Sequence, residues 1–457
     1  AGGRTHRRKP VARARGELES MGWQEYYRSR LVSAEEAAGV IKNGHKVVFT
    51  LFTSAVAIAA AIAARKNELE GVDIWVPTPL GEYPWFAPGW EDSFRATCIF
   101  VTGFIRSMMR EKRCDFWVGT TSYYCSSQDP EAGPQEKDID VVVTQVSPPN
   151  QHGYCCFGAL HWDKRATMKR GRTVLAEVDS RQIRTYGDNQ VHVSEIDYFV
   201  EHTNPPFQTP LPTVFDENAV KISELVGSLI KNADTLQIGT GVYTNALPSL
   251  GIFDNREDLG WHSELTPPGL VRLVEQGLFH GPRKTLNRNK VVGTWIGNDE
   301  EEFAYVNENP LFEVHPGEYV LDIRTIAAHD NMVSINSGLA VDLTGQIAAE
   351  SLGPRTHSGV GGQPEFAIGA ALSRGGRYIC VIPSTAREGK VSRIVPHLEH
   401  GTIVTVPRYF ADIVVSEHGI ARLKGKTQRQ RAEELTAIAH PDFRAELRKE
   451  AQRLFWP

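Results

Sequence analysis

The hydrophobic positions of this chain fall into short apolar runs that alternate with stretches of helical periodicity. Ser33 followed by Glu36 has the form of a capping box, so we expect a helix over 34–41. An Ala-rich stretch at 54–65 predicts a second helix. Buried strands are predicted at 46–52, 72–76, 140–144 and 173–178. Strands that alternate with helices indicate a layered α/β domain with a largely parallel sheet.

The same alternation restarts after a proline-rich segment at 201–212. That segment has no hydrophobic periodicity, which is typical of a stiff linker between domains. Beyond it a helix is predicted at 219–231, and the charged residues 428–455 form a helical segment interrupted at Pro441. The strands expected in this half are 235–238, 378–382, 402–406 and 413–415.

The length of 457 residues allows two or three domains of roughly 100–200 residues each. We place a basic disordered tail at 1–20, an N-terminal α/β domain at 21–210 and a C-terminal α/β domain at 211–457. The tail carries arginines and a lysine without the hydrophobic region of a secretory signal.

Composition narrows the classes of protein that this chain can represent. No apolar run reaches the ~18 residues of a membrane span. The formal net charge of -5 argues against general nucleic-acid binding. The six cysteines form no CxxC pair, so we expect reduced, mostly buried thiols. A cytoplasmic location is expected, or an organelle matrix if the basic N-terminus is the remnant of a targeting segment.

A first candidate site lies where the strand predicted at 235–238 runs into Gly239 and Gly241 and then into a helix. Glycine lets the backbone pass close to a ligand, and the amides of a helix N-terminus attract negative charge. The third glycine of the dinucleotide-binding fingerprint is missing. From the residues alone, a tight strand–helix turn without a ligand is the favoured interpretation.

A second candidate is Glu264, which stands among apolar and small residues before a helix expected to begin at Pro267. From the residues alone two interpretations stay open: the carboxylate is a functional group, or it caps that helix, because acids favour first turns. His262 is a candidate base, although a single histidine is more often structural. Trp261 and Tyr243 are candidate walls of a site, and core packing explains them as well.

A third candidate is the glycine cluster of Gly359, Gly361 and Gly362, ahead of a predicted helix. Its density favours a close approach of backbone to ligand, although a flexible turn is the simpler interpretation.

A fourth stretch, 384–393, carries Arg387, Lys390 and Arg393, which are able to bind phosphates by charge-assisted hydrogen bonds. A solvated charged face is the more usual interpretation of such a run. The sequence contains no metal-binding, Walker or G-x-S-x-G motif, and no metal is expected.

Together these stretches resemble the acetyl-CoA hydrolase/transferase family, which includes 4-hydroxybutyrate CoA-transferase-like and acetate CoA-transferase-like enzymes. The similarity runs from about Arg30 to the C-terminal helices. It rests on sequence segments that occur in the same order as in the family: QVSPPNQHGY at 145–154, HVSEIDYFVE at 192–201, NMVSINS at 331–337, VDLTG at 341–345, SGVGGQ at 358–363, SEHGIA at 416–421 and AHPDF at 439–443.

The resemblance implies two CoA-transferase-type α/β domains, each a largely parallel sheet flanked by helices, with the active site at their interface, in a homodimer or higher homo-oligomer. It implies that Glu264, in the His262-Ser-Glu264 word, is the catalytic residue. The oxyanion and CoA contacts that it implies are Gly239, Thr240, Gly241, Val242, Tyr243, Asn336, Ser358, Gly361 and Gly362. Arg387 and Lys390 are expected phosphate contacts.

The chain departs from the family pattern at Thr244, at Glu365 and over 51–54. Many members have proline at the first position, and an aspartate is common at the second. The last two departures concern loops that shape the acyl pocket, so the preferred acid stays open.

By this resemblance the protein is an enzyme, a CoA-transferase. It is expected to move coenzyme A from an acyl-CoA to acetate, butyrate, 4-hydroxybutyrate or a similar acid through a glutamyl-CoA thioester on Glu264. A carboxylate is expected to be ionised at neutral pH, so Glu264 needs no separate base. Backbone amides near Thr240 and Gly362 are the candidate oxyanion donors. Acyl-CoA and the acid are substrates, and no tightly bound cofactor is expected. Two alternatives remain: an acyl-CoA hydrolase on the same scaffold, and a non-catalytic CoA-binding protein.

Overall fold

The computed structural model describes residues 21–79, 81–103, 105–122, 124, 139–205, 208–209, 211–212 and 214–457. The predicted tail at 1–20 and Cys125 lie outside these residues. Contacts divide the chain into one unit of Ala1–Val118 with Tyr123–Pro206 and a second unit of Gly119–Ser122 with Phe207–Pro457. The sequence does not indicate that the short segment Gly119–Ser122 joins the second unit.

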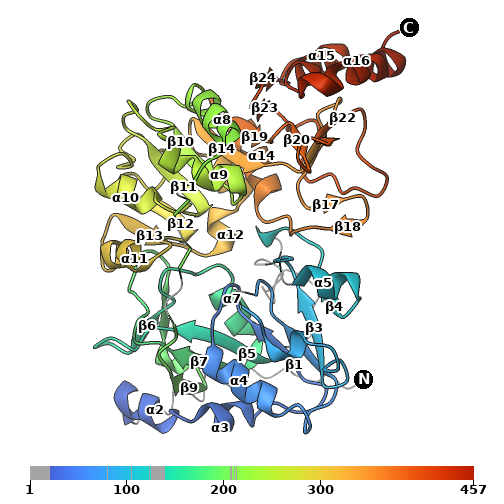
Figure 1. The fold of residues 1–457 in the computed structure, drawn as a ribbon. Coiled ribbons are helices and arrows are strands. Elements are labelled where there is room, and N and C mark those ends of the chain that lie inside the picture. Colours follow the sequence, from blue (N-terminus) through green and yellow to red (C-terminus); the bar gives the residue numbers. More distant parts are fainter. Residues whose placement is uncertain are drawn as a thin grey trace, which may run out of the picture. The chain divides into compact units, whose positions relative to one another are not determined.

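The first unit is built on a parallel sheet with the strand order β4-β3-β2-β1-β5-β7-β9 (Figure 1). Its strands are β1 (Lys46–Phe49), β2 (Val72–Trp75), β3 (Phe94–Cys98), β4 (Cys114–Phe116), β5 (Ile139–Val146), β7 (Gly171–Val178) and β9 (Tyr198–Glu201). A separate antiparallel pair consists of β6 (Tyr154–Cys156) and β8 (Gln190–His192). The helices are α2 (Trp23–Ser29), α3 (Ala34–Ala38), α4 (Val56–Ala64), α5 (Ile105–Arg110) and α7 (Lys164–Arg170).

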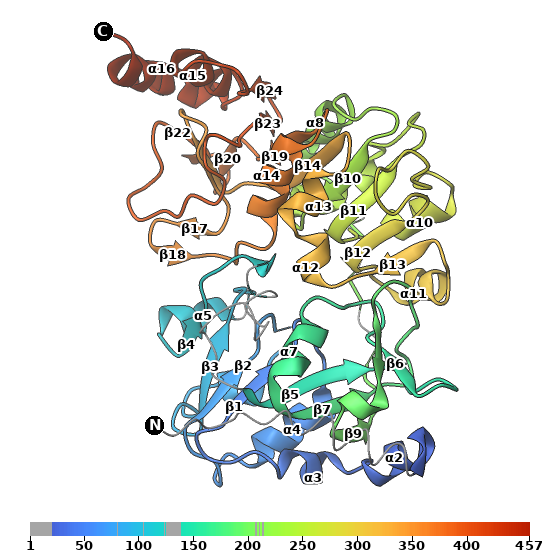
Figure 2. The ribbon, with the colours of Figure 1, turned by 180° about the vertical axis from the view of Figure 1, so that it is seen from behind.

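Alternate residues of β1 show why both faces of this sheet are covered. Val47 and Phe49 pack in a core that includes residues of α3 and α4, whereas Val48 packs in a second core that includes Met168 of α7. Figure 2 labels these three helices around the sheet. A strand buried on both faces carries a continuous apolar run, as the sequence shows here. The capping box of α3 is confirmed, because Ser33 Oγ accepts from the Glu36 amide and the Glu36 carboxylate accepts from the Ser33 amide.

The second unit is built on a sheet with the order β13-β12-β11-β10-β14-β19-β23-β24. All neighbours are parallel except β23 and β24. The strands are β10 (Thr235–Ile238), β11 (Gly260–Leu265), β12 (Val291–Trp295), β13 (Phe312–Val314), β14 (Met332–Ser337), β19 (Arg377–Val381), β23 (Ile413–Ser416) and β24 (Gly419–Arg422). Short strands follow β14 and β19: β15 (Ala340–Asp342), β16 (Ile347–Ala348), β17 (Ser351–Leu352), β18 (Arg355–Thr356), β20 (Thr385–Ala386), β21 (Val391–Ser392) and β22 (Ile394–Val395).

The helices of the second unit are α8 (Glu217–Gly227), α9 (Val242–Ala246), α10 (Leu270–Glu275), α11 (Glu300–Val306), α12 (Gly317–Val320), α13 (Ile323–Ala327), α14 (Gln363–Leu372), α15 (Gln428–Ala437) and α16 (Pro441–Phe455). The predicted break at Pro441 is confirmed, because this proline is the first residue of α16, where a missing amide hydrogen costs nothing. Short 3-10 turns occur at Pro84–Phe86, Val193–Glu195 and Pro248–Leu250.

The α/β class with two largely parallel sheets is confirmed. The strand predicted at 402–406 is wrong: this stretch forms one isolated bridge, between Val406 and Ile347. The Thr405 hydroxyl there donates to Glu350 Oε1 at 3.0 Å.

Two structural features are absent from the described residues. No helix among them has the length and apolarity that crossing a membrane requires. Among them, no group of three or more histidine, cysteine, aspartate or glutamate side chains is placed to bind a metal ion. The five described cysteines are buried and free.

Candidate active site

The predicted site residues of the second unit gather where its central parallel strands end. β10 lies between β11 and β14, and all three run in the same direction. The first glycine turn follows β10, Glu264 lies near the end of β11, and Asn336 lies near the end of β14. The carboxyl ends of parallel strands meet at one edge of a sheet, which is where ligands bind in open α/β folds.

Glu264 is buried at this edge, and its carboxylate contacts the second glycine turn. The backbone amide of Gly362 donates to Glu264 Oε2 at 3.3 Å. The backbone carbonyl of Glu264 accepts a hydrogen bond from the Thr294 hydroxyl at 2.5 Å, which fixes the end of β11. Gly362 is the N-cap of α14, so the carboxylate lies at the positive end of that helix.

These contacts exclude one of the two interpretations of Glu264. The helix after Pro267 begins at Leu270, and Glu264 is a strand residue outside its first turn. The alternative that Glu264 caps this helix is therefore wrong. The carboxylate instead bonds the N-cap amide of a different helix, α14, which is far away in the sequence.

The charge state of Glu264 differs from the expectation. Burial, and secondly the charge of Glu365, raise the pKa of Glu264 to about 8, against the opposing effects of the Gly362 amide and the Thr121 hydroxyl. The carboxyl therefore holds its proton at neutral pH in the free protein. The expectation that Glu264 is already ionised is wrong, because it ignored the cost of a charge away from water.

The second glycine turn leaves no room for side chains beside Glu264. A Cβ on Gly362 would stand 2.4 Å from Leu321 Cδ2 and 3.1 Å from Glu264 Oε2. Gly361 has φ +60°, a conformation that L side chains rarely adopt. The Thr121 amide donates to the Gly361 carbonyl at 3.1 Å, which joins the segment Gly119–Ser122 to this turn.

Glu365, in the first turn of α14, is a second buried carboxyl of this site, with 4% of its surface exposed. Burial raises its pKa to about 7, against the lowering effects of the Thr120 hydroxyl and the Ser122 amide. Within the described residues neither carboxylate oxygen makes a hydrogen bond of ordinary geometry. Sequence reasoning noted Glu365 only as a departure and missed Thr120 and Thr121, which no local signal marks.

The first glycine turn is packed against the end of β14. A Cβ on Gly239 would stand 2.2 Å from Asn336 Oδ1. Asn336 is held in a buried network, in which Gln237 Nε2 donates to Asn336 Oδ1 at 3.0 Å and Asn336 Nδ2 donates to Gln237 Oε1 and to Ser334 Oγ, each at 3.0 Å. This network fixes the side chain of Asn336 next to the turn.

Ser337, the last residue of β14, connects the two glycine turns. A Cβ on Gly241 would stand 2.2 Å from Ser337 Oγ, so the first turn approaches β14 as closely as glycine allows. The carbonyl of Ser337 accepts from Gln363 Nε2 at 3.2 Å, at the start of α14. Glu264, both turns and Asn336 therefore belong to one connected arrangement within the second unit.

The remaining predicted contacts are exposed or form hydrogen bonds with other residues. Val242 is exposed, and Tyr243 Oη donates to Asp216 Oδ2 at 3.1 Å. Ser358 Oγ donates to the Ala349 carbonyl at 3.2 Å, which is a contact inside its own loop. Thr240 is exposed in the first turn.

Arg387 and Lys390 lie on the exposed turn of the hairpin formed by β20 and β21. Lys390 Nζ lies 3.6 Å from Glu388 Oε2. No contact among the described residues brings either cation to the two carboxyls. Their predicted contact with phosphate rests on the sequence.

Two neighbours of Glu264 in the sequence, His262 and Trp261, are buried in the interior of the second unit. His262 is fully buried, its Nε2 lies 2.9 Å from the Val320 carbonyl, and burial holds its pKa well below the usual value. Burial and the contact with Val320 favour the structural interpretation of His262 over a role as a base. Trp261 is also buried, with its ring centroid 5.6 Å from that of Phe279, so it is a core residue rather than a wall of the site.

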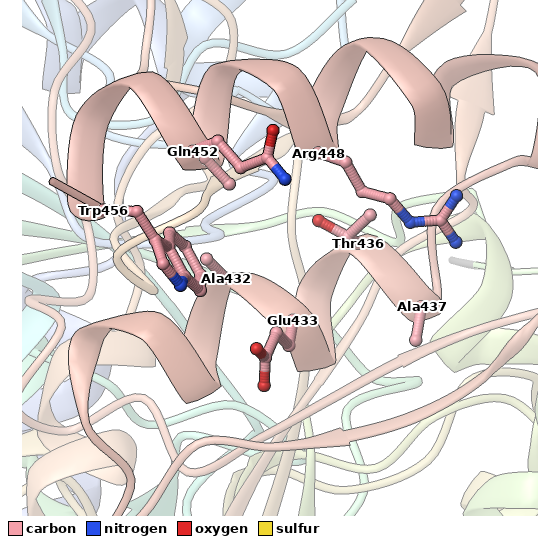
Figure 3. Close-up of a pocket in the computed structure, with 8 residues that line it drawn as sticks. Ala432, Glu433, Thr436, Ala437, Arg448, Gln452 and Trp456 are labelled. Carbon is pink, nitrogen blue, oxygen red and sulfur yellow. The ribbon is translucent and has the colours of Figure 1, made fainter.

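A cavity of about 370 Å³ lies elsewhere in the second unit, in the groove between α15 and α16 (Figure 3). None of the predicted site residues lines it. Its lining residues are Ala432, Glu433, Thr436, Ala437, Arg448, Ala451, Gln452 and Trp456.

A buried carboxyl at a helix N-terminus, between two glycine turns at the carboxyl edge of a parallel sheet, has the form of an enzyme active site. Residues 16–209 match the acetyl-CoA hydrolase/transferase N-terminal domain, and residues 299–451 match the acetyl-CoA hydrolase/transferase C-terminal domain. The chain belongs to the acetyl-CoA hydrolase/transferase family.

Individual relatives support this assignment. The chain is 38% identical to the 4-hydroxybutyrate coenzyme A transferase of Clostridium kluyveri, over 95% of this chain and 100% of that protein. It is 33% identical to the butyryl-CoA:acetate CoA-transferase of Anaerostipes caccae, over 95% and 98%. The crystal structure of RipA from Yersinia pestis matches with a TM-score of 0.88 and 30% identity, over 96% and 100%. The comparisons confirm the predicted family, fold class and enzyme class.

Proposed function

We propose that the protein transfers coenzyme A from an acyl-CoA to a small carboxylic acid, through a covalent thioester on Glu264. The observation that carries this proposal is the Glu264 carboxyl, buried and bonded to the Gly362 amide. A buried carboxyl with a fixed backbone donor is suited to become an acyl group and return to a carboxylate, because the donor serves both states. The relatives named above are CoA-transferases, which agrees with a transfer of coenzyme A.

The reaction proceeds in balanced steps. The Glu264 carboxylate, after losing its proton, attacks the thioester carbonyl, and the C–S bond breaks to give a mixed anhydride and the CoA thiolate. The thiolate then attacks the glutamyl carbonyl, and the first acid leaves as its carboxylate. A second carboxylate reverses both steps and takes the CoA. No bond of ATP is broken, since thioester and anhydride are close in energy.

Each attack on the glutamyl carbonyl places negative charge on a glutamate oxygen. The Gly362 amide already donates to Glu264 Oε2, so it is positioned to donate to that oxyanion. The partial positive charge of the α14 N-terminus adds to this stabilisation. This is the role that we propose for Gly362, with Thr240 as a second candidate donor.

We propose that the two glycine turns and Asn336 bind the CoA portion. The close packing of Gly239 on Asn336 and of Gly241 on Ser337 keeps the first turn free of side chains where the ligand would pass. The proposed contacts are Gly239, Thr240, Gly241, Val242, Tyr243, Asn336, Ser358, Gly361 and Gly362, with Arg387 and Lys390 as phosphate contacts. Acetate, butyrate and 4-hydroxybutyrate are the candidate acids.

Burial favours transfer over hydrolysis. Glu264 has 9% of its surface exposed and Glu365 has 4%, so an anhydride formed here is shielded from water. Hydrolysis of the acyl-CoA would need an ordered water beside the glutamyl carbonyl. Retention of the buried carboxyl also argues against a protein that only binds CoA. We further propose a homodimer or higher homo-oligomer, which light scattering would test.

The test is an exchange assay with acetyl-CoA and isotopically labelled acetate, read by mass spectrometry of the CoA esters. Transfer predicts that label enters acetyl-CoA, and that little free CoA appears. Release of free CoA at a rate independent of added acetate would instead indicate a hydrolase. No turnover with acetyl-, butyryl- or 4-hydroxybutyryl-CoA would favour the binding protein. Glu275→Gln, which alters an exposed glutamate of α10, is the matched control for Glu264→Gln.

A further inference from the structure

The two carboxyls of the site approach the same helix N-terminus. Glu365 is the third residue of α14, the position from which an acid commonly reaches back to the N-cap amide in a capping box. In this protein that amide, of Gly362, donates to Glu264 instead. Glu264 therefore accepts the hydrogen bond from the Gly362 amide that Glu365 would accept in a capping box of α14.

The segment Gly119–Ser122 connects the two carboxyls from the other side. The Thr121 hydroxyl interacts with Glu264, whereas the neighbouring Thr120 hydroxyl and the Ser122 amide interact with Glu365. Adjacent residues of one short segment thus contact both groups, and the Thr121 amide bonds the Gly361 carbonyl at 3.1 Å. Two carboxyls so confined and buried do not both carry a charge without a large cost.

We propose that Glu365 is a positioning residue of the reaction: its side chain, whose carboxylate oxygens make no hydrogen bond of ordinary geometry within the described residues, turns towards Glu264 when substrate binds and accepts the proton of Glu264 as Glu264 attacks. This inference rests on the proposed function. The step is a transfer within the pair: neutral Glu264 and ionised Glu365 become ionised Glu264 and neutral Glu365. No other reactant is needed. In the free enzyme the charge of the pair stays on Glu365, and Glu264 remains a neutral acid until the substrate is bound.

The pKa values of Glu264 and Glu365 are shifted by burial, by hydrogen bonds and, for Glu264, by the charge of Glu365, rather than by further charged groups. No cation is among the described groups that shift the pKa of either carboxyl. On β11 itself, His262 lies two positions before Glu264 and is held neutral by burial, as is its neighbour His329. The pKa values of Glu264 and Glu365, about 8 and about 7, are consistent with one proton held by the pair at neutral pH.

Infrared titration of the protonated carboxyl band tests the pair without any CoA chemistry. Wild type is expected to show two ionisations, and Glu264→Gln should lose the more alkaline one. Glu365→Gln should leave one ionisation and shift the midpoint of Glu264 downward by about one unit, since a neighbouring charge typically contributes 1–3 units. Glu365→Asp keeps the charge and should retain two coupled ionisations.

The pH dependence of transfer provides the second readout. The pH at which the rate at low acyl-CoA begins to rise should be lower in Glu365→Gln and close to that of wild type in Glu365→Asp.

In Glu365→Gln, an unchanged titration midpoint of Glu264 together with an unchanged pH–rate profile would overturn the inference while leaving transfer intact. If Glu365→Gln does not fold, ionisation of both carboxyls in wild type near the ordinary pKa of a glutamate would overturn it. Loss of all transfer with a normal infrared result would contradict only the proposed function.

Discussion

Glu264 and Glu365 approach the N-terminus of α14 from two different elements, one from the end of β11 and the other from the first turn of the helix itself. The N-cap amide of Gly362 bonds to Glu264, at 3.3 Å. The geometry therefore explains both the position of the proposed nucleophile and its raised pKa. Both properties come from contacts between segments that are far apart in the sequence.

Gly362→Ala should lower the rate of transfer by on the order of 10², the typical cost of losing one oxyanion donor. The added Cβ would stand 2.4 Å from Leu321 Cδ2 and 3.1 Å from Glu264 Oε2, so the amide and the carboxylate must separate. Steady-state kinetics measure the effect. Gly103→Ala is the control, because its Cβ would meet nothing within 4 Å. Equal rates for both variants and wild type would contradict the role of Gly362.

Asn336→Ala should both destabilise the second unit and raise KM for acyl-CoA. Removing the amide leaves Gln237 and Ser334 buried without this partner, which costs ~1–3 kcal/mol. It also removes the side chain that packs on Gly239. Thermal unfolding and KM are the measurements, with the exposed Asn43→Ala as control. An unchanged KM in a folded Asn336→Ala protein would argue against the proposed contact with CoA.

The rate of transfer at low acyl-CoA should rise with pH over the range in which Glu365 and Glu264 ionise, from about 7 to about 8. The attacking form of Glu264 is the carboxylate, and burial together with Glu365 raises its pKa to about 8 in the free enzyme. Rates at low substrate report ionisations of the free enzyme. A pH–rate profile of kcat/KM provides the measurement. A plateau that already begins near the ordinary pKa of a glutamate would show that Glu264 is ionised in the free enzyme.

Stability should depend on pH in the opposite sense. A carboxyl whose pKa is raised on folding holds a proton that the unfolded chain has lost, so the free energy of unfolding falls as pH rises from the ordinary value of 4.5 towards about 8. The slope is up to ~1.4 kcal/mol per pH unit for each such proton. Glu264→Gln removes one of them.

Thermal unfolding of wild type and Glu264→Gln across this range tests the prediction. The stability of Glu264→Gln relative to wild type should increase with pH. A constant difference between the two proteins would show that Glu264 has the same pKa folded and unfolded.

Local sequence patterns predicted much of the fold around the site. The apolar run before Gly239 gave β10, and the glycine cluster at 359–362 correctly preceded a helix, α14. The strand that carries Glu264 was missed, because His262 and Ser263 interrupt its apolar character with polar residues that are nevertheless buried. Burial of polar residues is decided by tertiary partners such as the Val320 carbonyl.

The strand predicted at 402–406 failed for the converse reason. Its β-branched residues favour a strand, but pairing also requires a neighbouring strand, and Val406 bridges Ile347 at one point. The interactions of Thr120 and Thr121 with the two carboxyls were invisible for a similar reason: no local pattern reports which distant segment will cover a helix N-terminus. The charge state of Glu264 depends on the same distant contacts.

The most direct test of the central claim is the intact mass of the protein after incubation with acetyl-CoA and no acceptor acid. A covalent thioester on Glu264 predicts a mass increase of one CoA less water, which is absent from Glu264→Gln, present in Glu275→Gln and removed by excess acetate. The same adduct on Glu264→Gln, or no adduct on a wild-type protein that still exchanges label between acetate and acetyl-CoA, would contradict the claim that Glu264 carries the CoA.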